Sequence, residues 1–258
     1  MTTAALARPR APRWLRLVLP LSLLALWQYA SMTGRVDPRI LPTPMAVLER
    51  GWTELVEGRL LINVGASLAR DLSGFIIGSM LGVIAGFLLG LSSLANRYVG
   101  PTFNAFKQIA IFAWVPLISV WFGTGEQAKI VFVALGAFTP VVVNTWEGAA
   151  NISVQHIEAA RVLCMSRWQF LRKVGIPSAL PSIFTGLHLG LFYSWLATVG
   201  AEYFMSIAPG IGGMIIEGRV QFDMPMVMLG VALLGVIGYT LNSLGELVRH
   251  RALRWQNR

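Results

Sequence analysis

Residues 158–177 read EAARVLCMSRWQFLRKVGIP, and this stretch lies between two long apolar runs at 130–146 and 183–207. The two runs hold one charged side chain between them, Glu202, whereas the stretch itself carries four basic ones. A helix needs roughly 20 largely apolar residues to cross a bilayer. The pattern therefore predicts two membrane spans joined by a structured basic loop.

Further apolar runs on both sides extend this pattern along the chain. They must form helices, because an open sheet would leave backbone groups unpaired in lipid. The predicted fold class is all-α, a polytopic membrane protein with six transmembrane helices and both termini in the cytoplasm. The predicted spans cover residues 14–32, 72–91, 103–122, 130–146, 183–207 and 226–247.

The composition agrees with a membrane protein. Of 258 residues, 55% are hydrophobic and 13% are charged, whereas a soluble domain is about 25% charged. Soluble globular, disordered, collagenous and disulfide-rich classes are thereby excluded. The one cysteine, Cys164, leaves no internal disulfide and no multi-cysteine metal site, and we expect no metal. The net charge of +9 needs no nucleic-acid partner, since membrane proteins concentrate basic residues on the cytoplasmic side.

The distribution of that charge predicts the orientation. With the N-terminus cytoplasmic, 14 of the 21 Lys and Arg residues lie inside and 7 outside, as the positive-inside rule favours. Basic cytoplasmic tails at 1–13 and 248–258 then flank a transmembrane domain at 14–247. The first run could instead be a signal peptide, but it exceeds a typical h-region and no clear A-x-A site follows. The external segment 34–71 is expected to contain a short amphipathic helix at 47–56.

The connection at 148–182, between the fourth and fifth spans, contains helix-start and helix-stop signals and does not have the composition of a linker. A first helix is predicted at 158–163, and Ser166 is a plausible N-cap for a second at 167–174. Pro177 and Pro181 are expected to end the second helix. Such a knob could lie on anionic lipid through its basic residues. It could equally dock against another protein through its aromatic side chains.

The spacing in this loop carries a family resemblance. Glu158-Ala159-Ala160, followed at fixed distance by Val174 and the pair Ile176-Pro177, resembles the EAA loop of membrane subunits of binding-protein-dependent ABC importers. The flanks are similar to the nitrate/sulfonate/taurine-type permease group of that family. The matching flanks are residues 41–44, 121–123, 138–141, 144–145, 201–202 and the glycine-rich loop up to Gly213.

The resemblance implies a division of labour between subunits. ATP and Mg would bind a separate cytoplasmic ABC ATPase, and this chain has no G-x-x-x-x-G-K-[ST] motif, so no catalytic residue or cofactor is expected here. A periplasmic or lipid-tethered solute-binding protein would deliver a small anionic or polar organic solute. A second copy would complete a homodimer in the bacterial cytoplasmic (inner) membrane. The residues that would couple to the ATPase are Glu158, Ala159, Ala160, Arg161, Cys164, Arg167, Trp168 and Pro177.

One loop position departs from the family pattern. Cys164 stands where the family usually has glycine, which permits a turn with φ > 0 that a side chain resists. We expect either an altered turn or capping by Ser166, and a thiol that serves as a small apolar filler rather than a redox group.

Polar side chains inside predicted spans are candidates for the solute pathway. They are Asn144, Ser194, Thr198 and Glu202. Ser194 and Thr198 share one helical face, and their alternative role is helix–helix packing through small polar residues. Glycines recur every four residues at positions 74, 78, 82 and 86. This ladder is expected to pack inside one subunit, with a moving interface or a dimer contact as alternatives.

Two other protein classes fit the sequence less well. A stand-alone secondary transporter or channel would usually show internal inverted repeats, and no such repeat appears. A membrane enzyme would need clustered His, Asp or Cys residues, which the sequence does not show.

Overall fold

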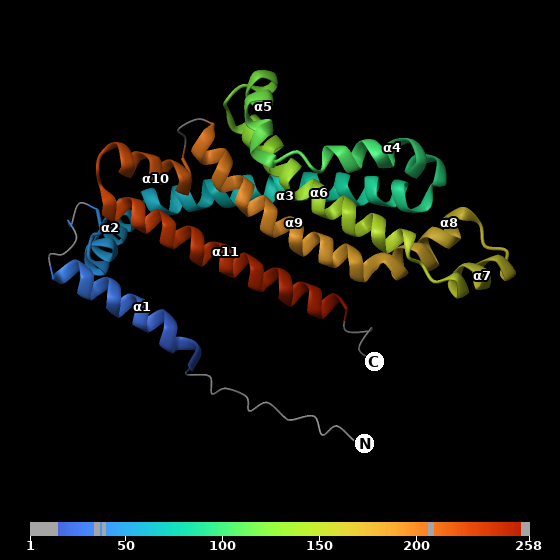
Figure 1. The fold of residues 1–258 in the computed structure, drawn as a ribbon, viewed down its shortest axis with the longest axis horizontal. Coiled ribbons are helices and arrows are strands. Elements are labelled where there is room, and N and C mark those ends of the chain that lie inside the picture. Colours follow the sequence, from blue (N-terminus) through green and yellow to red (C-terminus); the bar gives the residue numbers. More distant parts are fainter. Residues whose placement is uncertain (1–14, 34–36, 38–39, 206–208, 254–258) are drawn as a thin grey trace, which may run out of the picture.

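The computed structural model describes residues 15–33, 37, 40–205 and 209–253, and within these ranges every regular element is helical, as the sequence predicts. The elements follow one another in the order shown in Figure 1. They are α1 (Leu15–Met32), α2 (Pro44–Val56), α3 (Arg59–Leu91), α4 (Ser93–Phe106), η1 (Ile111–Trp114), α5 (Val115–Phe122), α6 (Glu126–Ala150), α7 (Val154–Val162), α8 (Arg167–Phe170), η2 (Leu171–Gly175), α9 (Ile176–Phe204), α10 (Ile211–Val220) and α11 (Met224–Ala252).

Four helical stretches in the described part are long and apolar enough to cross a membrane. They are α3, α6, the stretch Arg167–Phe204 and α11, and α4 with η1–α5 forms a fifth candidate that is bent by 94°. The first predicted run contains a shorter apolar helix, Val18–Met32. Residues 14 and 206–207 of the predicted spans lie outside the described residues. Length and composition thus support four or five spans, and the sixth stays a prediction.

The span predicted over 103–122 is not one continuous helix. α4 ends at Phe106, and the chain turns through Lys107–Ala110 before η1 begins. Gln108 N–H donates to the Ala105 carbonyl at 3.2 Å, and Ile109 N–H donates to that of Phe106 at 3.1 Å. These tight i→i+3 bonds end the α-helical ladder, and Ala110 is then extended with ψ 133°.

The helix that contains the second predicted span begins well before residue 72. α3 begins at Arg59, directly after Gly58, whose φ of 74° is the left-handed conformation that glycine allows. Arg70 and Asp71, which the sequence pattern places in an external segment, are buried within this helix. The amphipathic helix expected at 47–56 is present as α2, which packs against α11.

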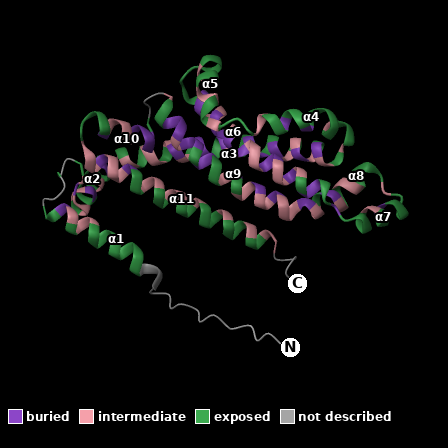
Figure 2. Cartoon of the chain, viewed as in Figure 1, coloured by how far each residue is buried: buried purple, intermediate pink, exposed green. Residues whose placement is uncertain are grey.

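The core lies where α6 packs against α3 on one side and α9 on the other, and these two contacts are the most extensive between helices of the described part. Figure 2 shows the buried residues concentrated on these three helices. The glycine ladder faces α6 within the same chain, as predicted. A Cβ on Gly74 would come within 2.5 Å of Val133, and a Cβ on Gly86 within 2.5 Å of Thr145. Small residues at this spacing let the two helix backbones approach closely.

Candidate functional site

The loop between α6 and α9 folds into a projecting element, residues 154–175, which we call the loop knob. It consists of α7, α8 and the short π-helical segment η2, and it lies at one end of the helix bundle (Figure 1). Ser153 caps α7 by accepting a hydrogen bond from the His156 N–H at 3.4 Å. The first helix therefore starts earlier than the sequence predicts, because Ser153 supplies a capping oxygen ahead of Glu158.

The turn after α7 is set by Cys164. Its φ is 46°, in the left-handed region. Its N–H donates to the Arg161 carbonyl at 2.9 Å, and the Met165 N–H donates to the Ala160 carbonyl at 3.1 Å. This pair of bonds is the Schellman arrangement, in which the left-handed position is usually glycine. The backbone that a glycine would favour is thus kept here with a cysteine in place, and the exposed thiol is not the buried filler that was expected.

Ser166 begins the second part of the knob, as predicted. Its hydroxyl accepts from the Gln169 N–H at 3.3 Å, and the Gln169 side chain accepts from the Ser166 N–H at 2.9 Å. This reciprocal capping box satisfies two backbone donors that the helix start leaves free. The expected end of the second helix at Pro177 and Pro181 is wrong, because helix continues from Arg167 to Phe204.

The two prolines are accommodated by their positions. Pro177 lies in the first turn of α9, where its missing N–H costs little. The wider π-helical turn η2 comes immediately before it. Pro181 lies inside α9, and its carbonyl accepts a hydrogen bond from the Thr185 hydroxyl at 3.0 Å. The α8 and η2 part of the knob and the long helix therefore form one continuous element.

The knob exposes both apolar and basic side chains. Val162, Leu163 and Trp168 are 83%, 66% and 68% exposed. Arg161 and Arg167 are exposed beside them, and Ala160 is the buried member of the Glu158-Ala159-Ala160 triplet. Of the eight residues predicted for coupling, Ala160 and half-buried Pro177 thus face the fold, whereas the other six are exposed. Apolar anchors ringed by basic groups suit a docking surface for an acidic or mixed protein face.

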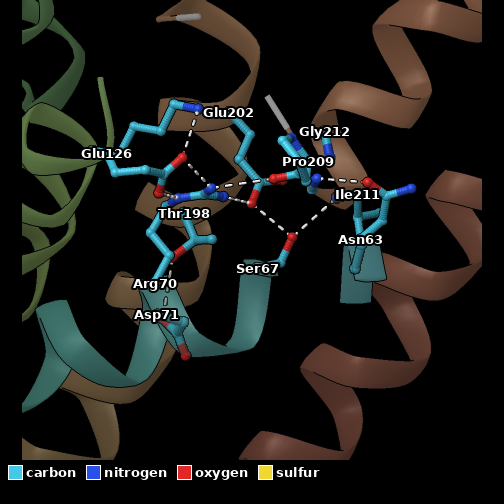
Figure 3. Close-up of polar contacts among 12 residues, drawn as sticks. Asn63, Ser67, Arg70, Asp71, Glu126, Thr198, Glu202, Pro209, Ile211 and Gly212 are labelled. Atoms are coloured by element: carbon cyan, nitrogen blue, oxygen red, sulfur yellow. Dashed lines mark hydrogen bonds and ion pairs between the residues drawn. The ribbon is translucent and has the colours of Figure 1, made fainter. Parts of the chain in front are cut away.

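A second constellation of polar residues lies toward the opposite end of the bundle. We call it the Arg70 cluster, and it comprises Asn63, Ser67, Arg70, Glu126 and Glu202 (Figure 3). The Arg70 guanidinium donates to both carboxylate oxygens of Glu126, at 2.9 and 2.7 Å, and forms an ion pair with Glu202. Three helices, α3, α6 and α9, are thereby joined by charged groups.

The same cluster holds the start of α10. The Glu202 carboxylate accepts from the Ser67 hydroxyl at 2.6 Å and from the Gly212 N–H at 2.7 Å. Ser67 in turn accepts from the Ile211 N–H at 3.0 Å, and the Asn63 side-chain oxygen accepts from the Gly210 N–H at 2.8 Å. Free N–H groups at a helix start are satisfied here by side chains of α3 and α9.

Sequence reasoning identified Glu202 but missed its partners. Arg70 precedes Gly74 by four residues, so it continues the glycine ladder toward the N-terminus of α3. That phase places it on the face that meets α6. A span that begins at residue 72 hides this signal, because it leaves Arg70 outside the helix.

The predicted pathway residues fall into two environments. Ser194, Thr198 and Glu202 are buried between helices, and the Thr198 hydroxyl donates to Asp71 at 3.3 Å. Asn144 is only half-buried, and it lines a cavity between α4, α6 and α9. Its side-chain amide donates to the Pro140 carbonyl at 2.8 Å. The structure therefore brings the first three together in a packed helix contact and sets Asn144 apart.

Several long apolar helices and a projecting loop knob define a helical membrane protein. Among the residues that the structure describes, no group of three or more His, Cys, Asp and Glu side chains could hold a metal ion. Residues 78–254 match the family described as binding-protein-dependent transport system inner membrane component. The chain belongs to this family of ABC importer permeases.

Its relatives include permeases of several importers. The chain is 34% identical to a Bacillus subtilis protein described as an aliphatic sulfonates transport permease, SsuC, over 95% of this chain and 88% of the relative. It is 35% identical to the bicarbonate transport system permease CmpB of Synechococcus elongatus, over 86% and 83%. It is 29% identical to the taurine transport system permease TauC of Escherichia coli, over 90% and 86%.

Solved structures show the same fold. An inward-facing methionine ABC transporter, MetNI, superimposes with a TM-score of 0.66 at 23% identity, over 77% of this chain and 98% of the matched chain. An amino acid ABC transporter with histidines gives a TM-score of 0.58 at 19% identity, over 77% and 96%.

Proposed function

We propose that this chain is the membrane-spanning subunit of an ATP-driven importer for a small anionic organic solute. Two copies would form the pathway, and an extracytoplasmic binding protein would deliver the solute. ATP and Mg would be bound by a separate cytoplasmic ATPase. The relatives named for aliphatic sulfonates, taurine and bicarbonate support this solute class, since each of those molecules carries an anionic group.

The continuity between the second part of the loop knob, α8 and η2, and α9 carries the proposal. The helical stretch Arg167–Phe204 has 38 residues, a length of roughly 55 Å at 1.5 Å per residue. Trp168 lies near one end of this stretch, and Glu202 near the other. A force applied at the knob would therefore displace the Arg70 cluster as a rigid-body motion, because a continuous helix transmits displacement along its axis.

The charge on the knob supports docking at its surface. Arg161, Arg167, Arg172 and Lys173 are exposed, and Glu158 is an acidic residue among them. In this proposal Trp168 and Leu163 fill a groove of the ATPase, while the arginines set the orientation. The knob would then lie in the cytoplasm, with the N-terminus on the same side and the protein in a bacterial inner membrane.

Association and coupling test this function. The chain is co-expressed with a candidate ABC ATPase subunit, purified, and reconstituted into proteoliposomes with a candidate binding protein. We expect a stable complex whose ATP hydrolysis rises when solute-loaded binding protein is added. Solute flux by the chain alone, with no ATPase association, would instead identify a stand-alone transporter or channel.

A further inference from the structure

The break between α4 and η1 places a lysine beside a cavity. Lys107 is the C-cap of α4, and its backbone N–H donates to the Phe103 carbonyl at 2.9 Å. Lys107 is one of the residues that line a partly open cavity of about 420 Å³ between the break, α6 and α9. A volume of this size suits a small-molecule site.

The cavity lies near the middle of both long helices. On α6 it is bounded by Leu135 through Asn144, and on α9 by Leu189 and Tyr193. Thr139 is about 20 Å along the helix axis from Glu126 and about 16 Å from Ala150, at 1.5 Å per residue. If α6 crosses the bilayer, as its length and hydropathy indicate, the cavity is close to the middle of the membrane.

Lys107 differs from the other lysine in this part of the bundle. Lys129 is 1% exposed and lies 3.4 Å from the Glu126 carboxylate, so its charge has a partner. Lys107 has no hydrogen-bond or ion-pair partner for its ammonium group among the residues that the structure describes. None of the residues that line the cavity is Asp or Glu. An unpaired charge at this depth is costly and marks a functional position in membrane proteins.

The remaining polar side chains of the cavity can each donate a hydrogen bond. Thr139 and Tyr193 contribute hydroxyls. The Asn144 amide uses one N–H for the Pro140 carbonyl, which leaves its second N–H for a ligand. The rest of the wall is mainly apolar, for example Leu135 and Leu189. One cation, several donors and an apolar wall match a small amphipathic anion.

We propose that this cavity is an intramembrane binding site for the anionic group of the transported solute, with Lys107 as its counter-charge. Thr139, Asn144 and Tyr193 complete the hydrogen bonds, and the apolar wall receives the organic part of a sulfonate or carboxylate. The assignment of the ligand as the transported solute rests on the proposed function.

The first test is direct binding to the assembled transporter in nanodiscs, without the binding protein. Thermal unfolding is followed while ethanesulfonate, taurine or bicarbonate is titrated, with ethyl methyl sulfone as a neutral analogue of the sulfonate. We expect at least one anion to raise the melting temperature in a saturable manner, while the neutral sulfone does not. Stabilisation by the sulfone equal to that by the anions, or no stabilisation by any anion at 50 mM, would overturn the site.

Three variants then assign the effect to Lys107. Lys107→Met is expected to weaken anion binding and ATP-driven uptake at least tenfold, and Lys107→Arg to retain most of both. Gln108→Met is the matched control, because Gln108 is the exposed neighbour that does not line the cavity, and it should behave as wild type. Anion binding by Lys107→Met equal to wild type would contradict the proposal.

Two readouts separate a solute site from a coupling defect and from a lipid site. ATP hydrolysis stimulated by the binding protein should persist in Lys107→Met, since the loop knob is unchanged. If the binding protein does not stimulate ATP hydrolysis by the wild-type transporter, the proposed function is contradicted. The anion-binding measurements then decide on the binding site independently. If the site instead takes a lipid phosphate, anionic lipid in the nanodiscs should raise the melting temperature by itself, and ethanesulfonate, taurine and bicarbonate should add nothing in either anionic or phosphatidylcholine nanodiscs. That result would also overturn the proposal.

Discussion

The Arg70 guanidinium and the Glu202 carboxylate form an ion pair across the contact of α3 and α9, with side chains only 2% and 3% exposed. The two residues are 132 positions apart in the sequence. Glu202 also accepts from Gly212, so the pair holds the start of α10 as well as the two long helices. It is one of the polar contacts that join the helices at the end of the bundle opposite the loop knob.

Breaking this pair from one side is expected to be severe. Glu202→Gln leaves the Arg70 charge incompletely paired in a buried site and should lower the free energy of unfolding by about 3 kcal/mol. Glu126→Gln is the matched control, because the Glu126 side chain is 54% exposed, and it should cost about 1 kcal/mol or less. Thermal unfolding of the purified protein in detergent measures both. If both variants lost the same free energy of unfolding, burial of the Arg70–Glu202 pair would not be the cause of the destabilisation.

At the turn formed by Cys164, a substitution is expected to raise the free energy of unfolding. Its φ of 46° is strained for any residue with a Cβ, so Cys164→Gly should stabilise the protein by about 1 kcal/mol. Cys164→Ala removes the thiol and keeps the Cβ, and it should leave stability unchanged. Melting temperatures of the three proteins separate the effect of backbone conformation from that of sulfur. If Cys164→Ala stabilised the protein and Cys164→Gly did not, the thiol and not the backbone conformation would be the source of the strain.

The glycine ladder is tested by two glycines of the same helix. A Cβ on Gly78 would collide with the backbone of Ala134, whereas a Cβ on Gly65 meets nothing within 4 Å. Gly78→Ala should therefore destabilise by about 1–3 kcal/mol through forced separation of α3 and α6. Gly65→Ala should stabilise by up to about 1 kcal/mol, because alanine favours helix. Unfolding midpoints in detergent check both signs, and a harmless Gly78→Ala would mean that the contact tolerates separation.

The fold class and the loop knob could be predicted because their signals are local. Apolar runs indicate the long helices, and Ser166 predicts the helix start that the structure completes with Gln169 as a capping box. The glycine ladder likewise predicts close helix packing, since its spacing alone fixes a common face. Each of these depends on residues within a few turns of one another.

The features that could not be predicted have tertiary causes. A charged residue such as Arg70 is expected outside a membrane span. In the fold Glu126 and Glu202 neutralise its charge, so the start of α3 depends on partners far away in the sequence. The bend after α4 has no local signal, because residues 107–110 contain neither glycine nor proline. Pro181 favours a helix end, yet α9 continues through it, since packing against α6 outweighs one lost backbone bond.

Coupling through the loop knob is the central claim, and surface variants test it better than core ones. Trp168→Ala removes an exposed aromatic side chain and should leave the fold intact. Glu158→Lys alters charge at an exposed position and should act in the same direction. Ala160→Trp would also be expected to uncouple transport, but Ala160 is 5% exposed, so that variant would disturb the packing of the knob itself.

The most direct measurement is ATP-driven solute uptake by proteoliposomes that contain the ATPase and either wild-type or Trp168→Ala permease. The amount of ATPase that co-purifies with each permease is measured in parallel. The control is Phe222→Ala, which removes an aromatic side chain that is 82% exposed and lies outside the knob. The account predicts that Trp168→Ala weakens ATPase association and lowers uptake at least tenfold, about 1.4 kcal/mol, while Phe222→Ala does neither. Wild-type ATPase binding and uptake in both Trp168→Ala and Glu158→Lys would contradict it.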